Sequence, residues 1–233
     1  MKYLLNIGNT HTGVVQFDPE SGKMSAFRLF STGEFSVSDL PAGDIAAVSV
    51  VPAVRERLRE RDIFFLTAEN SRGAVDFTRV DCSTLGADRV ANALALAEYF
   101  PLPGVVIDCG TAITMEVVDS GKVFRGGAIA PGRMLMRKSL FSGTAQLPDI
   151  PLSSDIPGGV GVGTAGNIAF GVDSGCVGMI REFLRIARLE HGIESVVFTG
   201  GDAGFFLPAF PEAAAADENF TYRGLAIGAG WMC

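Results

Sequence analysis

The chain has 233 residues, 48% of them hydrophobic, and a formal net charge of −7. This length allows one large domain or two small ones with hydrophobic cores. The acidic balance, without any run of basic residues, argues against nucleic acid as a partner. No apolar stretch reaches the roughly 20 residues of a membrane helix without an interrupting Gly, Asp or Arg, so we expect no membrane partner either.

The N-terminal residues and the cysteines indicate a cytoplasmic protein. The chain begins without the charged, apolar and small-residue regions of a signal peptide. Its four cysteines, Cys82, Cys109, Cys176 and Cys233, are scattered and form no CxxC pair, which argues against structural zinc and against a disulfide framework. We therefore expect reduced thiols.

The first part of the chain predicts a meander of antiparallel strands followed by mixed elements. Residues 3–7, 13–17 and 24–30 are apolar runs separated by turn residues. Residues 45–51 and 63–66 predict two further strands. Between them, residues 52–61 predict a charged helix that starts at Pro52, where the missing N–H is tolerated. Residues 87–100 have helical spacing, with Val90, Leu94 and Ala97 on one face.

The second part predicts a similar mixture. Residues 105–108 predict a strand, and residues 114–118 and 122–124 a hairpin around residues 119–121. Helices are predicted over residues 131–140 and from 167 to about 188. A strand is predicted over residues 195–199, and a Gly-Gly pair follows it. Residues 224–232 predict a closing helix that is rich in small residues and therefore has to pack closely on a partner.

The chain contains an approximate repeat at half its length. A strand runs into Asn6-Ile7-Gly8-Asn9-Thr10, and about a hundred residues later another runs into Asp108-Cys109-Gly110-Thr111. Each is followed by a further apolar strand. Short pieces of this kind also arise by coincidence, but two copies at this spacing favour duplicated α/β lobes. We expect an N-terminal lobe over residues 1–104 and a C-terminal lobe over residues 105–233, with the last helix able to pack back on the first lobe.

The two glycine turns have the properties of phosphate-binding loops. Glycine lets backbone N–H groups approach a phosphate closely, and threonine adds a hydroxyl donor. A carboxylate just before such a turn can hold Mg²⁺ against nucleotide phosphates. Asp108 occupies this place in the second copy, whereas the first copy has the neutral Asn6. Each turn taken alone is equally compatible with an ordinary hairpin.

Two further motifs suggest a phosphotransferase. Thr199-Gly200-Gly201 follows an apolar strand and resembles the adenosine-contacting turn of actin-like ATPases. Asp88 and Arg89 follow a glycine at a predicted helix start, where Asp88 fits an N-cap equally well. As a functional pair, the carboxylate could accept a proton from a substrate hydroxyl and the guanidinium could bind a substrate carboxylate.

In this order the motifs resemble those of the type III pantothenate kinases, which belong to the acetate kinase, sugar kinase, Hsp70 and actin superfamily. The resemblance runs nearly end to end. The matching segments are Asn6-Ile7-Gly8-Asn9-Thr10, Ser49-Val50-Val51-Pro52, Gly86-Ala87-Asp88-Arg89, Asp108-Cys109-Gly110-Thr111-Ala112-Ile113-Thr114, Gly126-Gly127-Ala128-Ile129-Ala130-Pro131-Gly132, Thr144-Ala145-Gln146-Leu147-Pro148 and Thr164.

The resemblance implies a fold and a reaction. The fold is α/β, with two duplicated actin-like (ribonuclease H-like) lobes and a nucleotide cleft between them. The reaction is ATP-dependent phosphorylation of pantothenate to 4'-phosphopantothenate, the first step of coenzyme A biosynthesis. The implied cofactors are ATP, Mg²⁺ and a monovalent cation, K⁺ or NH₄⁺, and the implied assembly is a homodimer.

It also implies roles for individual residues. Asp88 is expected to be the general base, and Gly86, Arg89 and Thr164 to contact pantothenate, the last of these across a dimer interface. Asp108 is expected on the metal side. The expected ATP and phosphate contacts are Asn6, Gly8, Asn9, Thr10, Gly110, Thr111, Gly200 and Gly201.

The sequence departs from the family pattern at a few positions. Asn6 replaces an Asp that the family uses near metal and phosphates, Ile113 replaces a Thr, Glu116 stands where Asp is usual, and Phe170 replaces a small residue before Gly171. Three hypotheses follow: an active pantothenate kinase, a degenerate paralogue that binds ligand and regulates a partner, or another small-molecule kinase on the same fold.

Overall fold

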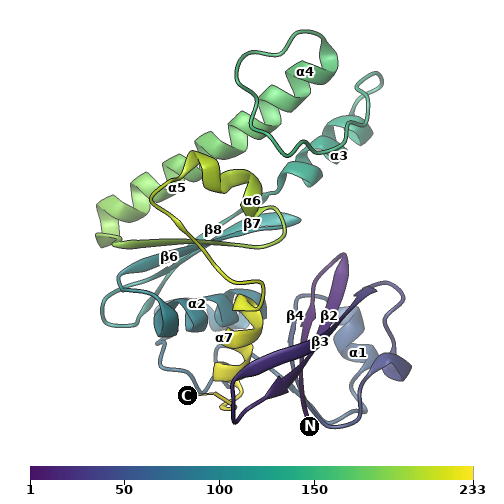
Figure 1. The fold of residues 1–233 in the computed structure, drawn as a ribbon, viewed down its shortest axis with the longest axis vertical. Helices are drawn as coiled ribbons and strands as arrows, with labels where there is room; N and C mark the ends of the chain where they lie inside the picture. Colours follow the sequence, from purple (N-terminus) through teal and green to yellow (C-terminus); the bar gives the residue numbers. More distant parts are fainter. Residues whose placement is uncertain (233) are drawn as a thin grey trace. The chain divides into compact units, whose positions relative to one another are not determined.

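The computed structural model describes residues 1–232, so Cys233 lies outside the described residues. The chain divides into two compact units (Figure 1). Unit 1 comprises Met1–Leu102, Val118–Arg125 and Asp217–Cys233, and unit 2 comprises Pro103–Val117 and Gly126–Ala216. Cys82, Cys109 and Cys176 are free thiols.

Unit 1 is built on a five-stranded sheet in the order β3-β2-β1-β4-β5. Its strands are β1 Lys2–Ile7, β2 His11–Asp18, β3 Lys23–Ser31, β4 Asp44–Ser49 and β5 Ile63–Phe65. The antiparallel pairs β1/β2 and β2/β3 confirm the predicted meander. Strands β4 and β5 then add in parallel on the other side of β1.

The α-helices of unit 1, within residues 1–232, are α1 Pro52–Arg57, α2 Ala87–Tyr99 and α7 Phe220–Gly228. Figure 1 shows α2 and α7 packed against each other. Gly224 makes this possible, because a Cβ there would lie 1.8 Å from the carbonyl oxygen of Ala91. The Thr221 hydroxyl also donates a hydrogen bond to the Asn92 side chain at 2.8 Å. The prediction that the closing helix packs closely on a partner is confirmed, although this helix starts and ends earlier than expected.

Unit 2 repeats the same sheet topology. Its order is β10-β9-β6-β7-β8, so β6 takes the place of β1, with β7 and β9 in the places of β2 and β4. The strands are β6 Gly104–Cys109, β7 Ala112–Val118, β8 Phe124–Pro131, β9 Ser195–Thr199 and β10 Ala214–Ala215. The β6/β9 and β9/β10 pairs are parallel, as are their counterparts β1/β4 and β4/β5.

The helices of unit 2 bury one apolar face against this sheet. They are α3 Arg133–Gly143, α4 Thr164–Ala169, α5 Gly175–His191 and the short α6 Ala203–Phe206. A π-helical turn, Phe170–Ser174, joins α4 to α5. Ile180, Leu184 and Phe198 are among the fully buried core residues.

Two sequence predictions are corrected by these bounds. The family-matching segment from Gly126 to Pro131, to which the sequence assigned no regular structure, is part of strand β8, and the predicted short strand over residues 122–124 contributes only Phe124 to it. Helix α1 ends at Arg57 rather than at residue 61, because Leu58 leaves helical geometry after closing the last turn. The predicted α/β class with two duplicated lobes is confirmed. None of the helices formed by residues 1–232 has the length and apolar character needed to cross a bilayer.

Candidate functional site

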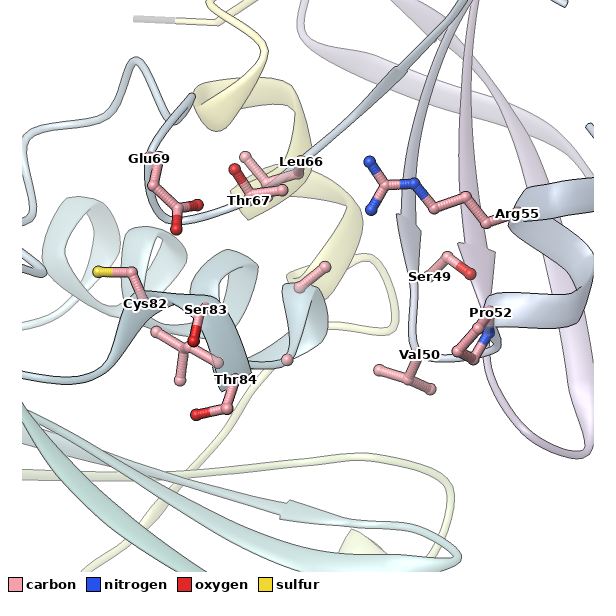
Figure 2. A pocket seen from close by; sticks show the side chains of 13 residues that line it. Ser49, Val50, Pro52, Arg55, Leu66, Thr67, Glu69, Cys82, Ser83 and Thr84 are labelled. Carbon is pink, nitrogen blue, oxygen red and sulfur yellow. The ribbon is translucent and has the colours of Figure 1, made fainter. Parts of the chain in front are cut away.

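Unit 1 contains an open pocket of about 470 Å³, a size typical of small-molecule sites. Figure 2 shows the side chains that surround it. They come from the segment after β4, the segment after β5 and the approach to α2. The lining residues are Ser49, Val50, Pro52, Arg55, Leu66, Thr67, Glu69, Cys82, Ser83, Thr84, Leu85, Gly86 and Ala87.

Local sequence features position the walls of this pocket. Strand β4 ends at Ser49, and Pro52 starts α1 at its first turn, so the chain reverses along one side of the pocket. The Val50 N–H donates to the Ile7 carbonyl oxygen at 3.2 Å, which ties this wall to the end of β1. The opposite wall ends at Gly86, the N-cap residue of α2. The pocket therefore joins two of the motifs that the sequence singled out.

Asp88 lies in the first turn of α2, directly after the pocket-lining Gly86 and Ala87. The helix begins at Ala87, so the interpretation of Asp88 as an N-cap is wrong. Its Oδ1 accepts a hydrogen bond from the Arg89 N–H at 2.8 Å. A Cβ on Gly86 would lie 2.7 Å from the same Oδ1. The carboxylate thus lies over Gly86, and the glycine leaves it the space to do so.

Burial is the dominant influence on this carboxyl group. It raises the pKa of Asp88 above its usual value, and the Arg89 N–H and guanidinium oppose this effect. A carboxylate with a raised pKa is a better proton acceptor than a solvated one. Asp88 is therefore suited to general-base chemistry beside the pocket.

The first glycine turn, residues 8–10, connects β1 to β2. Within it the Gly8 N–H donates to the His11 carbonyl oxygen at 3.0 Å. The buried Thr32 hydroxyl donates to the Gly8 carbonyl oxygen at 2.7 Å and lies 3.0 Å from the Thr12 hydroxyl. Asn9 and Thr10 are exposed, and Asn6 is half-buried in β1. The turn is therefore held by hydrogen bonds at Gly8, while Asn9 and Thr10 are accessible to solvent.

The second glycine turn, residues 110–111, connects β6 to β7 and is enclosed more tightly. The Gly110 N–H donates to the Ala112 carbonyl oxygen at 2.9 Å, and the Gly132 N–H donates to the Thr111 carbonyl oxygen at 2.9 Å. Gly200 has a φ of 90°, and a Cβ there would lie 2.4 Å from Asp108 Oδ1. Glycine at position 200 is thus required both by backbone conformation and by the carboxylate beside it.

A buried network of charges supports the second glycine turn. Arg133 Nη1 donates to Asp202 Oδ1 at 2.9 Å, and Arg133 Nε donates to Asp173 Oδ1 at 2.9 Å. Arg137 Nη2 reaches Asp173 Oδ2 at 2.6 Å, and the Asp202 N–H donates to the Cys109 carbonyl oxygen at 2.9 Å. Burial raises the pKa of Asp202, while the Arg133 charge opposes this. Helix α3 and the segment after β9 are thereby fixed to the turn that follows Asp108.

The predicted site residues fall into local groups within each unit. In unit 1, Gly86, Asp88 and Arg89 lie together at the start of α2. In unit 2, Gly200 lies against Asp108, and Thr164 is the exposed first residue of α4. Among residues 1–232, no three His, Cys, Asp or Glu side chains gather into a group that could hold a metal ion. Asp108 with its glycine cradle nonetheless fits Mg²⁺, which commonly binds one carboxylate together with phosphates and water.

Sequence reasoning missed several residues around these sites. Arg55, Thr67 and Glu69 line the pocket without belonging to any motif. Thr32 braces the first glycine turn from a distant, unremarkable segment. Arg133 and Asp202 had a weak signal, because each directly follows the last glycine of a motif, Gly132 and Gly201.

Comparison with known proteins gives one consistent family. Residues 3–186 match the model of the family described as type III pantothenate kinase. A type III pantothenate kinase of Akkermansia muciniphila is 34% identical, with 99% of each chain covered. One from Kosmotoga olearia is 32% identical, with 97% of this chain and 95% of the relative covered.

Solved structures agree on the fold. A Baf family protein of Campylobacter jejuni superimposes with a TM-score of 0.68 at 22% identity, covering 95% of this chain and 94% of that one. A polyphosphate/ATP-glucomannokinase of Arthrobacter gives a TM-score of 0.53 at 16% identity, covering 97% and 96%.

Proposed function

The chain belongs to the type III pantothenate kinase family, and we propose that it transfers the terminal phosphoryl group of ATP to the primary hydroxyl of pantothenate. The product is 4'-phosphopantothenate, so the reaction is the first step of coenzyme A biosynthesis. The observation that supports this proposal in the chain itself is the pocket of unit 1. The segment Ser49–Pro52 lines one side of this pocket and Gly86 the other. The Asp88 carboxylate lies over Gly86.

In this mechanism Asp88 accepts the proton of the pantothenate hydroxyl. Phosphoryl transfer requires little from the protein beyond positioning and charge neutralisation, so one well-placed base is sufficient. Burial raises the Asp88 pKa and makes the group more basic, while the Arg89 N–H and guanidinium lower that pKa and so favour the ionised form. Gly86 and Arg89 contact the substrate beside this base, and Thr164 is a further pantothenate contact, supplied across a homodimer interface.

The phosphates are assigned to the two glycine turns. Backbone N–H groups and hydroxyls supply the donors, and the residues assigned to them are Asn6, Gly8, Asn9, Thr10, Gly110 and Thr111. Gly200 and Gly201 are assigned to the ATP nucleoside. Asp108 would hold Mg²⁺, which neutralises phosphate charge when bound, and a monovalent cation, K⁺ or NH₄⁺, completes the cofactor set. The cytoplasm is the proposed location.

A second candidate function rests on Asn6. A neutral amide stands where the family pattern has a carboxylate, and a weakened metal site is compatible with a paralogue that binds ligand without turnover and regulates a partner. The two functions differ in an observable way. The paralogue would be stabilised against heat by ATP or pantothenate and would form no ADP.

The proposed function is tested by measuring ADP formation with purified protein, Mg²⁺ and either K⁺ or NH₄⁺. We expect ADP release that depends on pantothenate, together with a product that is heavier by one phosphoryl group. Thermal stabilisation by both ligands, with no pantothenate-dependent ADP at millimolar ATP, would favour the binding paralogue. Turnover of another small alcohol in place of pantothenate would indicate a different small-molecule kinase.

A further inference from the structure

The pocket of unit 1 has a distribution of charge that suits an asymmetric anionic ligand. Among its lining side chains, Arg55 is cationic and Glu69 anionic, and the remaining ones are neutral. Figure 2 shows Arg55 entering from α1 and Glu69 lying across the pocket, above Cys82 and Ser83. A ligand with one carboxylate is therefore attracted to one side of the pocket and repelled from the other.

Arg55 is held in a position to bind such a carboxylate. Its guanidinium carbon lies 5.0 Å from the centre of the Phe65 ring, a cation–π contact that orients the side chain. Within residues 1–232 its guanidinium takes part in no ion pair. In Figure 2 the guanidinium extends from α1 toward Leu66 and Thr67. Its N–H donors are thus available on the pocket side.

Neighbouring arginines on the same segment are used differently. Arg59 pairs with Glu56, and Arg57 donates to the carbonyl oxygens of Thr32 and Gly33. Neither lines the pocket. Arg55 is thus distinguished from Arg57 and Arg59 by its position in the lining of the pocket, whereas the other two guanidinium groups are used by protein acceptors.

The positions of the reactive groups in the substrate also favour Arg55. Pantothenate carries its carboxylate at the end opposite to the reactive primary hydroxyl. If Asp88 accepts the hydroxyl proton beside Gly86, the carboxylate has to be bound away from α2. Arg89 follows Asp88 directly in α2, and its charge lowers the pKa of that group. We therefore assign Arg89 to the hydroxyl end of the substrate, in place of the carboxylate contact that the sequence suggested. The wall formed by α1 is the part of the pocket that offers a cation at the other end.

We propose that Arg55 binds the carboxylate of pantothenate and sets the preference of this enzyme for the acid over uncharged analogues. The inference rests on the proposed function, since the substrate is the one assigned there. Arginine suits this task because its planar fork can donate two parallel hydrogen bonds to a carboxylate.

The test compares pantothenate with pantothenol, in which a hydroxymethyl group replaces the carboxylate. The proteins are the wild type, Arg55→Leu, and Arg61→Leu as a matched control from the same segment but outside the pocket. Arg55→Leu should raise the KM for pantothenate about 10- to 100-fold, the range expected for losing a charge-assisted hydrogen bond. Its kcat should stay within about twofold of the wild type, and its preference for pantothenate over pantothenol should nearly disappear.

The outcomes separate this inference from the proposed function. An unchanged preference in Arg55→Leu, or an equal loss in Arg61→Leu, would overturn the role of Arg55 while leaving the kinase assignment intact. If the wild type phosphorylates neither compound, the kinase assignment fails. Calorimetric binding of the two compounds then tests Arg55 directly, and equal affinity of the wild type for both would overturn it. Circular dichroism and thermal unfolding establish that each variant is folded.

Discussion

The two glycine turns occupy equivalent places in two equivalent sheets, yet they are supported in different ways. The first is braced by a neutral hydroxyl, that of Thr32, and follows the neutral Asn6. The second follows Asp108 and is enclosed by Gly132, by Gly200 and by the Arg133–Asp202 ion pair. Duplication therefore preserved the backbone topology, while the charges near each turn diverged.

The difference suggests that the two units have different functions, one toward the acceptor substrate and the other toward the nucleotide. In unit 1 the charges that we assign to substrate binding and catalysis lie in the pocket and at the start of α2, where Arg55, Asp88 and Arg89 suit an organic acceptor. In unit 2 they lie behind the turn, where Asp108 suits metal and phosphate. Exchanging or removing these charges should consequently affect acceptor chemistry and nucleotide chemistry separately.

The largest effect is expected from Asp88→Asn. The variant retains the shape of the side chain but cannot accept a proton, so kcat should fall by about 10³-fold or more. ATP affinity should be nearly unchanged. Because the raised pKa means that the ionised carboxylate destabilises the folded state above that pKa, the variant should be at least as stable as the wild type at neutral pH. Steady-state kinetics and thermal unfolding measure both quantities, and retained turnover would remove Asp88 from the mechanism.

Asp108→Asn should make the second turn resemble the first. We expect kcat to fall by about 10²-fold, corresponding to roughly 2.7 kcal/mol of transition-state stabilisation. The Mg²⁺ concentration needed for half-maximal activity should rise, whereas the affinity for pantothenate should be unchanged. A metal titration at saturating substrates makes the measurement. An unchanged Mg²⁺ requirement would show that the two turns do not differ in the proposed way.

Gly200→Ala tests the enclosure of the second turn. The positive φ and the contacts with Asp108 and Cys109 both oppose a Cβ, so the variant should lose about 2 kcal/mol of stability or more. Gly201→Ala is the matched control, because no atom lies within 4 Å of a Cβ at that position. Chemical denaturation of the two variants gives the comparison, and equal stabilities would contradict it.

Asn6→Asp should make the first turn resemble the second. Restoring the carboxylate of the family pattern should raise pantothenate-dependent turnover by about tenfold or more, if a weakened metal site limits the rate. The measurement is kcat at saturating ATP and Mg²⁺. If neither the wild type nor Asn6→Asp shows pantothenate-dependent turnover, the result would support the binding paralogue.

The smallest expected effect concerns the pH profile. Only the ionised Asp88 accepts a proton, so activity falls as the pH drops through its raised pKa. Removing the opposing charge with Arg89→Gln should raise that pKa further and move the acid limb of kcat/KM to higher pH. A profile of kcat/KM against pH for both proteins tests the sign of this shift, and a move toward lower pH would contradict it.

The sequence predicted what is encoded locally. The meander, helix α2 and strands β6 and β9 follow from apolar periodicity and from Gly and Pro punctuation, and the order of the motifs identified the family. Most of strand β8 was not predicted because its glycines, Gly126 and Gly127, are typical of turns rather than strands, although pairing within the sheet decides their conformation.

Residues that act through tertiary contacts could not be predicted in the same way. Thr32 meets Gly8 across 24 positions of sequence, and Arg133 meets Asp202 across 69. Nothing in the local pattern around Arg55 distinguishes it from Arg57 or Arg59. The roles of Thr32 and Arg55 become visible only in the folded chain, which places Thr32 beside the first glycine turn and Arg55 beside the pocket.

The most direct test of the account is an amide chemical-shift titration of isotope-labelled protein with pantothenate. Because the acceptor is assigned to the pocket of unit 1, the largest perturbations should fall on both of its walls, at Ser49, Val50 and Arg55 on one side and at Gly86 and Ala87 on the other. Saturable binding that leaves both walls unperturbed would contradict the account.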